Sequence, residues 1–208
     1  MVQRLDRLKE SPSQTAGPYV HIGTTPHFIG IDNVYPVDLG SLPVPPEVKG
    51  ERIVLTGRIF DGSGNPLRDA LIEIWQADAS GLYPGRGEHR GTADTAFSGW
   101  ARQPVDGTTG IYRFETIKPG SAPYSDGRPM APHITFWIVS RGINVGLHTR
   151  LYFGDEEAAN AADPVLGRIE LKSRVPTLIA ARSDEGGVPT YTFDIRLQGE
   201  NETIFFDI

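Results

Sequence analysis

Residues 52–77 read "RIVLTGRIFDGSGNPLRDALIEIWQA" and carry the clearest strand signals of the chain. Over 52–60, Ile53, Leu55 and Ile59 fall on one face of an extended strand, because side chains alternate between the two faces. Residues 61–69 gather Gly, Asn and Pro at close spacing, which is turn chemistry. Residues 70–77 form a second apolar run of strand length. We therefore predict a hairpin with a long loop over 52–77.

The same pattern of short strands separated by turn signals continues to the end of the chain. The best helical candidate is 155–163, which is acidic at its start and is ended by Pro164. A short turn around 141–146 should join two of the strands as a hairpin. The fold class indicated is all-β, an antiparallel sandwich or barrel. The further strands are expected at 110–117, 132–140, 147–153, 191–198 and 203–207.

Residues 1–50 differ from the rest, because they contain three Pro-rich stretches without a sustained period of 2 or 3.6. We expect an extended N-terminal arm laid over another surface, with at most a short helix near 3–9. The arm is too rich in large apolar residues for a disordered tail. The predicted organisation is an arm over 1–50 and one β-sandwich-type domain over 51–208. The apolar residues that support this are Tyr19, Val20, Ile22, Phe28 and Ile31.

Composition limits the partners. The chain has 208 residues and a formal net charge of −6, which argues against nucleic acid as the main partner. Any small anionic ligand would need locally placed cations. There is no cysteine, so disulfides, thiolate metal sites and a cysteine nucleophile are excluded, which suits the cytoplasm. The start lacks the apolar region of a signal peptide, and no apolar run approaches the roughly 20 residues of a membrane span.

His133 and Thr135 are the first candidates for chemistry. On a strand, residues i and i+2 share one face about 6.5–7 Å apart, so two histidines at these positions could hold one metal ion. Here the second position is threonine, whose neutral hydroxyl is a poor ligand for a transition metal. Nor does any serine lie in a G-x-S-x-G elbow. The residues alone predict no self-sufficient catalytic constellation.

Several segments together resemble the intradiol ring-cleaving dioxygenases, and in particular their alpha-type subunits. The resemblance runs in order across nearly the whole chain. It implies that the all-β fold is a two-sheet antiparallel β-sandwich with long loops and at most one or two short helices. The segments are 13–23, 69–83, 112–120, 131–136, 140–144, 147–166 and 191–208.

The resemblance also assigns a metal site. In the iron-bearing beta-type subunits, a non-haem Fe(III) ion is held by two tyrosines and the two histidines of an H-x-H strand. The matching positions are Tyr83, Tyr124, His133 and Thr135, which we call the relic site. Alpha-type subunits lack the second histidine. The resemblance therefore implies that this chain holds no metal and that the partner beta subunit holds the Fe(III).

The alpha-type subunit is expected to complete the substrate pocket at the alpha–beta interface. The matching positions are Thr15, Gly17, Pro18 and Arg141, which we call the arm site. Glycine and proline give a rigid backbone that can approach a ring closely, and a guanidinium can orient a carboxylate. The implied reaction cleaves protocatechuate (3,4-dihydroxybenzoate) with O2 to 3-carboxy-cis,cis-muconate, in the β-ketoadipate pathway. No catalytic residue is expected in this chain alone.

Two alternatives stay open at this point. The chain could be a stand-alone intradiol catechol dioxygenase that uses Tyr83, Tyr124 and His133, with His148 or water as the fourth ligand. It could also be a non-catalytic structural β-sandwich subunit, in which Thr15 and Arg141 only pack against a neighbour.

Overall fold

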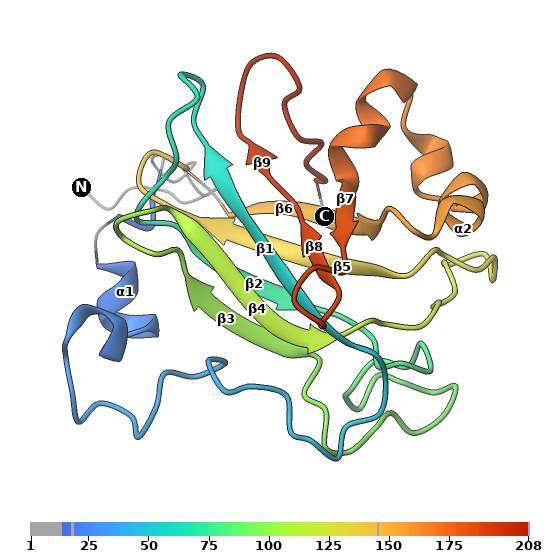
Figure 1. Cartoon of the computed structure of the whole chain (residues 1–208), viewed down its shortest axis with the longest axis horizontal. Coiled ribbons are helices and arrows are strands. Elements are labelled where there is room, and N and C mark those ends of the chain that lie inside the picture. The colour runs from blue at the N-terminus through green and yellow to red at the C-terminus, as the bar shows by residue number, and fades with distance from the viewer. Residues whose placement is uncertain (1–13, 18, 145, 208) are drawn as a thin grey trace, which may run out of the picture.

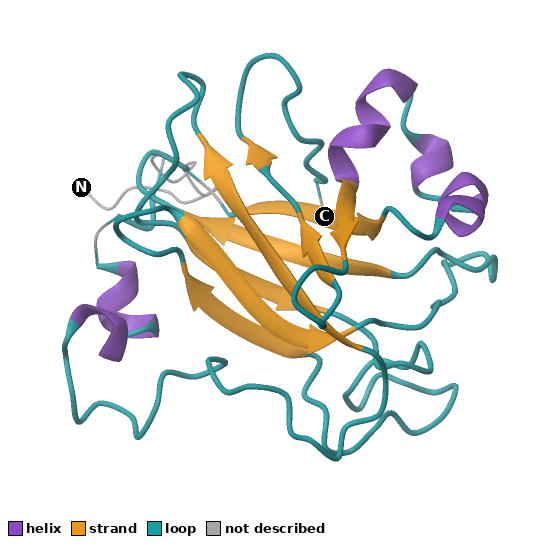
Figure 2. Ribbon diagram, viewed as in Figure 1, coloured by secondary structure: helices purple, strands orange, loops and turns teal. Residues whose placement is uncertain are grey.

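The computed structural model describes residues 14–17, 19–144 and 146–207, and these form nine strands and five short helical segments (Figures 1 and 2). The predicted all-β fold with one or two short α-helices is confirmed, and α2 lies within the predicted helix. The helix predicted near 3–9 lies outside the described residues. The strands are β1 Arg52–Phe60, β2 Leu71–Trp75, β3 Trp100–Pro104, β4 Ile111–Ile117, β5 His133–Val139, β6 Leu147–Phe153, β7 Ile179–Ser183, β8 Thr190–Thr192 and β9 Ile195–Arg196. The helices are α1 Val20–Thr24 and α2 Glu157–Ala162, with 3-10 segments η1 His27–Ile29, η2 Leu166–Arg168 and η3 Lys172–Leu178.

The strands form two layers that are joined at β7. One layer has the order β3-β2-β5-β6, and the other contains β8, β1 and β4, with β9 beside β1. The first residues of β7 pair with β6, and its last three residues pair with β8. The predicted two-sheet sandwich is therefore one sheet folded over at β7, and the two layers lie one behind the other in Figure 1.

The core lies between the layers and is rich in aromatic side chains. The Phe136 ring of β5 contacts rings from the facing layer, with centroid distances of 5.9 Å to Tyr112, 6.4 Å to Phe114 and 5.5 Å to Phe193. All three contacts are edge-on, the geometry that aromatic quadrupoles favour. The buried Tyr112 hydroxyl donates a hydrogen bond of 2.5 Å to the Phe193 carbonyl. One face of each layer is therefore sealed, and chemistry must use the outer faces or the ends.

The predicted hairpin over 52–77 is wrong. Strand β1 pairs with β4, β8 and β9, whereas β2 pairs with β3 and β5 in the other layer. The turn itself is present, since the Asp61 carboxylate accepts hydrogen bonds from the backbone N–H groups of Ser63 and Asn65. After it the chain crosses to the opposite layer. A turn signal reports a reversal of direction, but burial against the rest of the molecule decides which sheet the next strand joins.

Of the other strands, some were predicted, two were missed, and the predictions near the C-terminal end need correction. The hairpin of β5 and β6 is confirmed, and its strands pair antiparallel. Strands β3 and β7 were not predicted, because both have weak alternation and polar residues. The strand predicted at 191–198 is split into β8 and β9, and 203–207 forms only a single bridge from Phe206 to His148. Three pairings, β1–β8, β1–β9 and β6–β7, are parallel, so the sandwich is mixed.

The described part of the arm lies along the β3 edge and contains α1 and η1, neither of which was predicted. The Gly40 carbonyl accepts a hydrogen bond of 3.0 Å from the Arg102 backbone N–H in β3. Arg102 also reaches the Thr24 carbonyl at 3.4 Å. Within the described ranges, no helix combines the length and apolar character needed to cross a bilayer.

Candidate functional site

The relic site lies on the outer face of the layer that contains β2, β5 and β6. Thr135 of β5 is directly opposite Trp75 of β2 on one side and Arg150 of β6 on the other. His133 is opposite Tyr152. Because side chains alternate along a strand, these residues share the face that points away from Phe136 and the core. The expectation that His133 and Thr135 share one face is confirmed.

Tyr83 and His133 form a neutral pair at one side of this face. The Tyr83 hydroxyl lies 3.4 Å from His133 Nε2, and the Tyr83 ring stacks on Trp75 at 6.0 Å. His133 Nδ1 lies 2.8 Å from the Ala131 carbonyl, so Nδ1 carries the proton and Nε2 accepts. His133 is 4% exposed. Its burial, together with the charge of Arg150, lowers the pKa of His133 to about 4, and burial raises the pKa of Tyr83.

Tyr124 and Thr135 meet in a cavity next to this pair. The Tyr124 hydroxyl accepts a hydrogen bond from Arg168 Nη1, and the Arg168 guanidinium lies 5.6 Å from the centre of the Tyr124 ring. The cavity has a volume of about 210 Å³. The relic positions are therefore divided between a Tyr83–His133 contact and a cavity that Tyr124 shares with Thr135. The cavity is lined by Tyr124, Thr135, His148, Thr149, Arg150, Val165 and Phe206.

Arg150 is the main residue that the sequence analysis missed. Its guanidinium lies 3.5 Å from the Met130 sulfur and 5.8 Å from the centre of the Phe206 ring. Its positive charge lowers the pKa of both Tyr83 and His133, although burial outweighs this for Tyr83. Within the described ranges it forms no ion pair with a carboxylate. The available signal was the alternation of His148, Arg150 and Tyr152 along one strand.

The nearby carboxylate of Asp163 is already engaged. It is 2% exposed and accepts hydrogen bonds of 2.8 Å from the backbone N–H groups of Ala131, Val165 and Leu166. The Tyr152 hydroxyl lies 3.4 Å from it. Burial, with the Asp163 charge next, raises the pKa of Tyr152. Asp163 therefore holds the backbone at Ala131 and at residues 165–166 together over the outer face.

The donor set does not suit a ferric ion. Fe(III) is a hard cation that favours anionic oxygen ligands, whereas burial raises the pKa of the Tyr83 phenol and so disfavours its phenolate. Thr135 offers only a hydroxyl, and the Arg150 guanidinium beside it repels a second cation. The described residues contain no cluster of three or more His, Cys, Asp or Glu side chains that could hold a metal.

The described residues of the arm site gather at the other end of β5. Thr15 Oγ1 donates a hydrogen bond of 3.2 Å to the Ser140 carbonyl. Ser140 Oγ and Arg141 Nε both donate to the Asp69 carboxylate, at 2.7 and 2.5 Å. The Arg141 side chain is 66% exposed. Gly17 has a φ of +63°, which favours glycine, and Pro18 lies outside the described residues.

The relic site and the arm site are far apart within one chain. His133 opens β5 and Ser140 follows its last residue, so seven residues separate them. At about 3.3 Å per residue, Ser140 lies about 23 Å from His133 and about 17 Å from Thr135. Arg141 therefore cannot contact a ligand held at the relic site of its own chain.

A larger cavity of about 630 Å³ lies between residues 43–46 of the arm and the strands β1 and β4. None of the residues of the relic site or the arm site lines it.

Comparisons with known proteins all find dioxygenases. The model of the family described as Dioxygenase matches residues 26–199. The chain is similar to the protocatechuate 3,4-dioxygenase alpha chain of Pseudomonas putida, with 44% identity over 98% of each chain. It is also similar to the protocatechuate 3,4-dioxygenase beta chain of Burkholderia cepacia, with 36% identity over 76% of this chain and 68% of the relative.

A solved structure supports the fold. The dioxygenase domain of a dioxygenase and carbohydrate-binding fusion protein from Streptomyces sp. SirexAA-E superposes with a TM-score of 0.55. It is 23% identical, and the match covers 94% of this chain and 100% of that domain. At this identity the likeness concerns the fold alone.

Proposed function

Because this chain belongs to the intradiol dioxygenase family, we propose that it acts as the alpha subunit of a protocatechuate 3,4-dioxygenase. Its role is to complete the substrate pocket of a beta subunit that holds the Fe(III). The observation that carries the proposal is the placement of Arg141, which is exposed and follows Ser140, about 23 Å along β5 from His133 of the same chain. An arginine so placed suits a pocket on another chain.

The iron is assigned to the partner because of the chemistry around Thr135. Intradiol dioxygenases depend on non-haem iron, and the bound iron supplies the activation of the catechol and of O2. In this chain Arg150 lies opposite Thr135, and the half-buried Tyr83 and the buried His133 are neutral and in contact with each other. A cation beside three neutral groups disfavours a metal ion.

The arm site would position the substrate. Protocatechuate carries a carboxylate, and two terminal nitrogens of a guanidinium can bind a carboxylate bidentately. Arg141 uses Nε for Asp69. The Asp69 carboxylate therefore orients the Arg141 side chain. Thr15, Gly17 and Pro18 would close the pocket beside it, with the backbone of the arm next to the ring.

The arm also carries the surface that we assign to the beta subunit. Nine large apolar side chains among its described residues are exposed, and such a concentration of exposed apolar side chains suits a protein–protein contact. Tyr19 is the most exposed of them, at 75%. The set consists of Tyr19, Ile22, Phe28, Ile29, Ile31, Val34, Val37, Leu39 and Leu42.

The reaction proposed for the assembly is cleavage of 3,4-dihydroxybenzoate by O2 between its two hydroxyl-bearing carbons, which yields 3-carboxy-cis,cis-muconate. This product enters the β-ketoadipate route of aromatic catabolism. The absence of cysteine suits a reducing compartment, so we place the assembly in the cytoplasm.

The first test compares the chain alone with the chain co-produced with a beta subunit. We expect the chain alone to contain no iron, to lack visible absorbance and to consume no O2 with protocatechuate. The complex should gain iron, colour and activity together. Stoichiometric iron in the chain alone would overturn the proposal and would support the stand-alone enzyme, with His148 or water as the missing ligand.

The role of Arg141 is tested in the complex. Arg141→Ala should raise KM for protocatechuate about tenfold or more, because a charge-assisted hydrogen bond is lost, while the iron content stays the same. Arg113→Ala is the matched control, since Arg113 is also exposed and paired with a carboxylate, that of Glu115. If both variants keep the kinetics of the wild type, the arm site only packs, and the chain is a structural subunit.

A further inference from the structure

We propose that the cavity between Tyr124 and Arg150 binds a small aromatic carboxylate. This would be a second ligand site, built entirely from one chain, and its residue Thr135 lies about 17 Å along β5 from Ser140 of the arm site. It requires neither iron nor the beta subunit, so it does not depend on the proposed function.

The positive charge at this cavity lacks a compensating carboxylate. Neither Arg150 nor Arg168 forms an ion pair with any carboxylate of the described residues, and Arg168 bonds the hydroxyl of Tyr124. Asp163, close to Tyr152, has its carboxylate oxygens occupied by three backbone N–H groups. On a chain with a net charge of −6, Arg150 in the cavity wall and Arg168 on the hydroxyl of Tyr124 favour an external anion.

A further polar group at the cavity also lacks a partner. His148 lines the cavity, and its Nδ1 atom is buried without a hydrogen-bond partner in the described part of the chain. Buried polar atoms in folded proteins are nearly always paired, because an unpaired one keeps its full desolvation cost. His148 and Arg150 are two residues apart on β6, so their side chains share one face. An anion next to Arg150 would therefore lie beside His148 as well.

The remaining walls determine the kind of anion. Phe206, Val165 and the ring of Tyr124 give the cavity an apolar lining beside its charge. The Arg150 guanidinium already lies over the Phe206 ring. The volume of about 210 Å³ is below the roughly 300–1,000 Å³ typical of sites for drug-sized ligands. An aromatic acid with a single ring fits both the size and the lining.

The test uses 4-hydroxybenzoate as the probe and the full chain without a beta subunit, because a metal-bearing partner would offer a second site. Isothermal titration calorimetry should give one site per chain. Arg150→Met should weaken binding about tenfold to a hundredfold, since the charge-assisted hydrogen bonds are lost. Arg150→Lys keeps the charge but not the planar fork, so it should weaken binding less.

Arg128→Met is the matched control, because Arg128 lies four residues from Tyr124 but is exposed and paired with Asp126. It should bind the probe like the wild type. Near-ultraviolet circular dichroism verifies that each variant keeps its packing. Absence of binding at millimolar probe, or binding that survives Arg150→Met and Arg150→Lys unchanged, would overturn the site. Competition by acetate or inorganic phosphate at equal concentration would overturn the aromatic assignment.

Discussion

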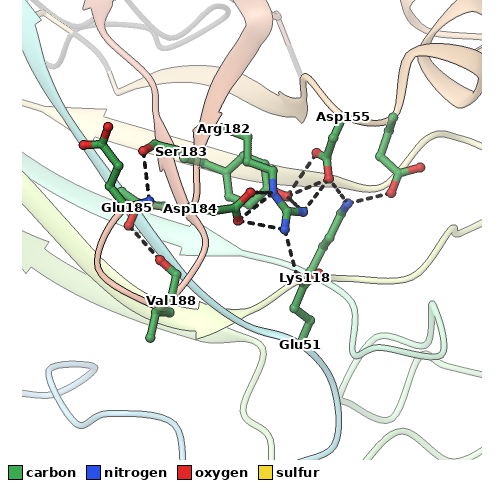
Figure 3. Close-up of polar contacts among 11 residues, drawn as sticks. Glu51, Lys118, Asp155, Arg182, Ser183, Asp184, Glu185 and Val188 are labelled. Atoms are coloured by element: carbon green, nitrogen blue, oxygen red, sulfur yellow. Dashed lines mark hydrogen bonds and ion pairs between the residues drawn. The ribbon is translucent and has the colours of Figure 1, made fainter.

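Two arginines on neighbouring strands, Arg182 of β7 and Arg150 of β6, have opposite surroundings. Arg182 lies in a network in which every cation has carboxylate partners (Figure 3). It pairs with Asp155 at 2.8 Å, with Asp184 at 2.9 Å and with Glu51 at 3.4 Å. Arg150, by contrast, has the Met130 sulfur and the Phe206 ring as neighbours and forms no ion pair within the described ranges.

The difference separates a structural charge from a charge available to a ligand. In the network of Figure 3, Lys118 follows β4, Asp155 follows β6 and Arg182 belongs to β7, so the contacts tie both layers together where the sheet folds over. Tyr191 of β8 adds a hydrogen bond of 3.0 Å to Asp155. These groups satisfy one another. Arg150 has no carboxylate partner among the described residues, so its charge is available to an anion.

The largest expected effect is on Asp155. Asp155→Asn removes the shared carboxylate and leaves Lys118, only 13% exposed, next to Arg182 without that acceptor. Breaking a partly buried charge network is strongly destabilising, so the free energy of unfolding should fall by about 2–3 kcal/mol. Urea denaturation measures it. Asp184→Asn, at the exposed rim of the same network, should change it by less than about 1 kcal/mol, and equal effects for both variants would contradict the ranking.

Acid should weaken the same network. Burial opposes the ionisation of Asp155, but hydrogen bonds from Lys118, Arg182 and Tyr191 outweigh it and lower the pKa of Asp155 to about 2. A carboxyl whose pKa is lower in the folded chain contributes stability above its unfolded pKa of about 3.9 and loses it as the pH falls toward the folded value. Between pH 4 and pH 2 the wild type should therefore lose about 1–2 kcal/mol from this group. Denaturation at several pH values should show a shallower loss for Asp155→Asn.

The smallest effect on stability is expected at Arg150. Arg150→Met removes a cation that has no carboxylate partner among the described residues, so the free energy of unfolding should stay within about 1 kcal/mol of the wild type. A loss similar to that of Asp155→Asn would show that Arg150 is structural, and the comparison would fail.

The same variant has a second readout at His133. Burial is the main cause that lowers the pKa of His133 to about 4, and the Arg150 charge is the next. Without that charge the pKa of His133 should rise, while burial keeps it below the ordinary value of about 6.5. A titration of the imidazole by NMR measures the change. If the pKa of His133 is the same in Arg150→Met and the wild type, the Arg150 charge does not act at His133, and it would not act on a ligand between the two residues either.

The strands of the core were largely predictable, because alternation is a local property of the chain. Ile53, Leu55 and Ile59 indicated β1, and the segment around His133 indicated β5. The pairing of β1 was not predictable in the same way. Its neighbours β4, β8 and β9 come from distant parts of the chain, and burial against them outweighed the turn at 61–65.

In the candidate site, too, some features could be predicted from the sequence and others could not. That His133 and Thr135 share a face follows from the two-residue repeat of a strand, and the lost second histidine is visible in the letters alone. That Arg150 lies directly opposite Thr135 depends on the register between β5 and β6. A shift of one residue would turn Arg150 toward the core.

The sequence by itself determined the all-β class, the family resemblance and the absence of a second strand histidine, because each is written in the order and type of neighbouring residues. Only the tertiary structure decided which layer each strand joins. It also decided that Arg150 lacks a carboxylate within the described chain while Arg182 has three. The physical reason is that register, burial and charge compensation depend on groups that are distant along the chain and meet only when the sheet folds over.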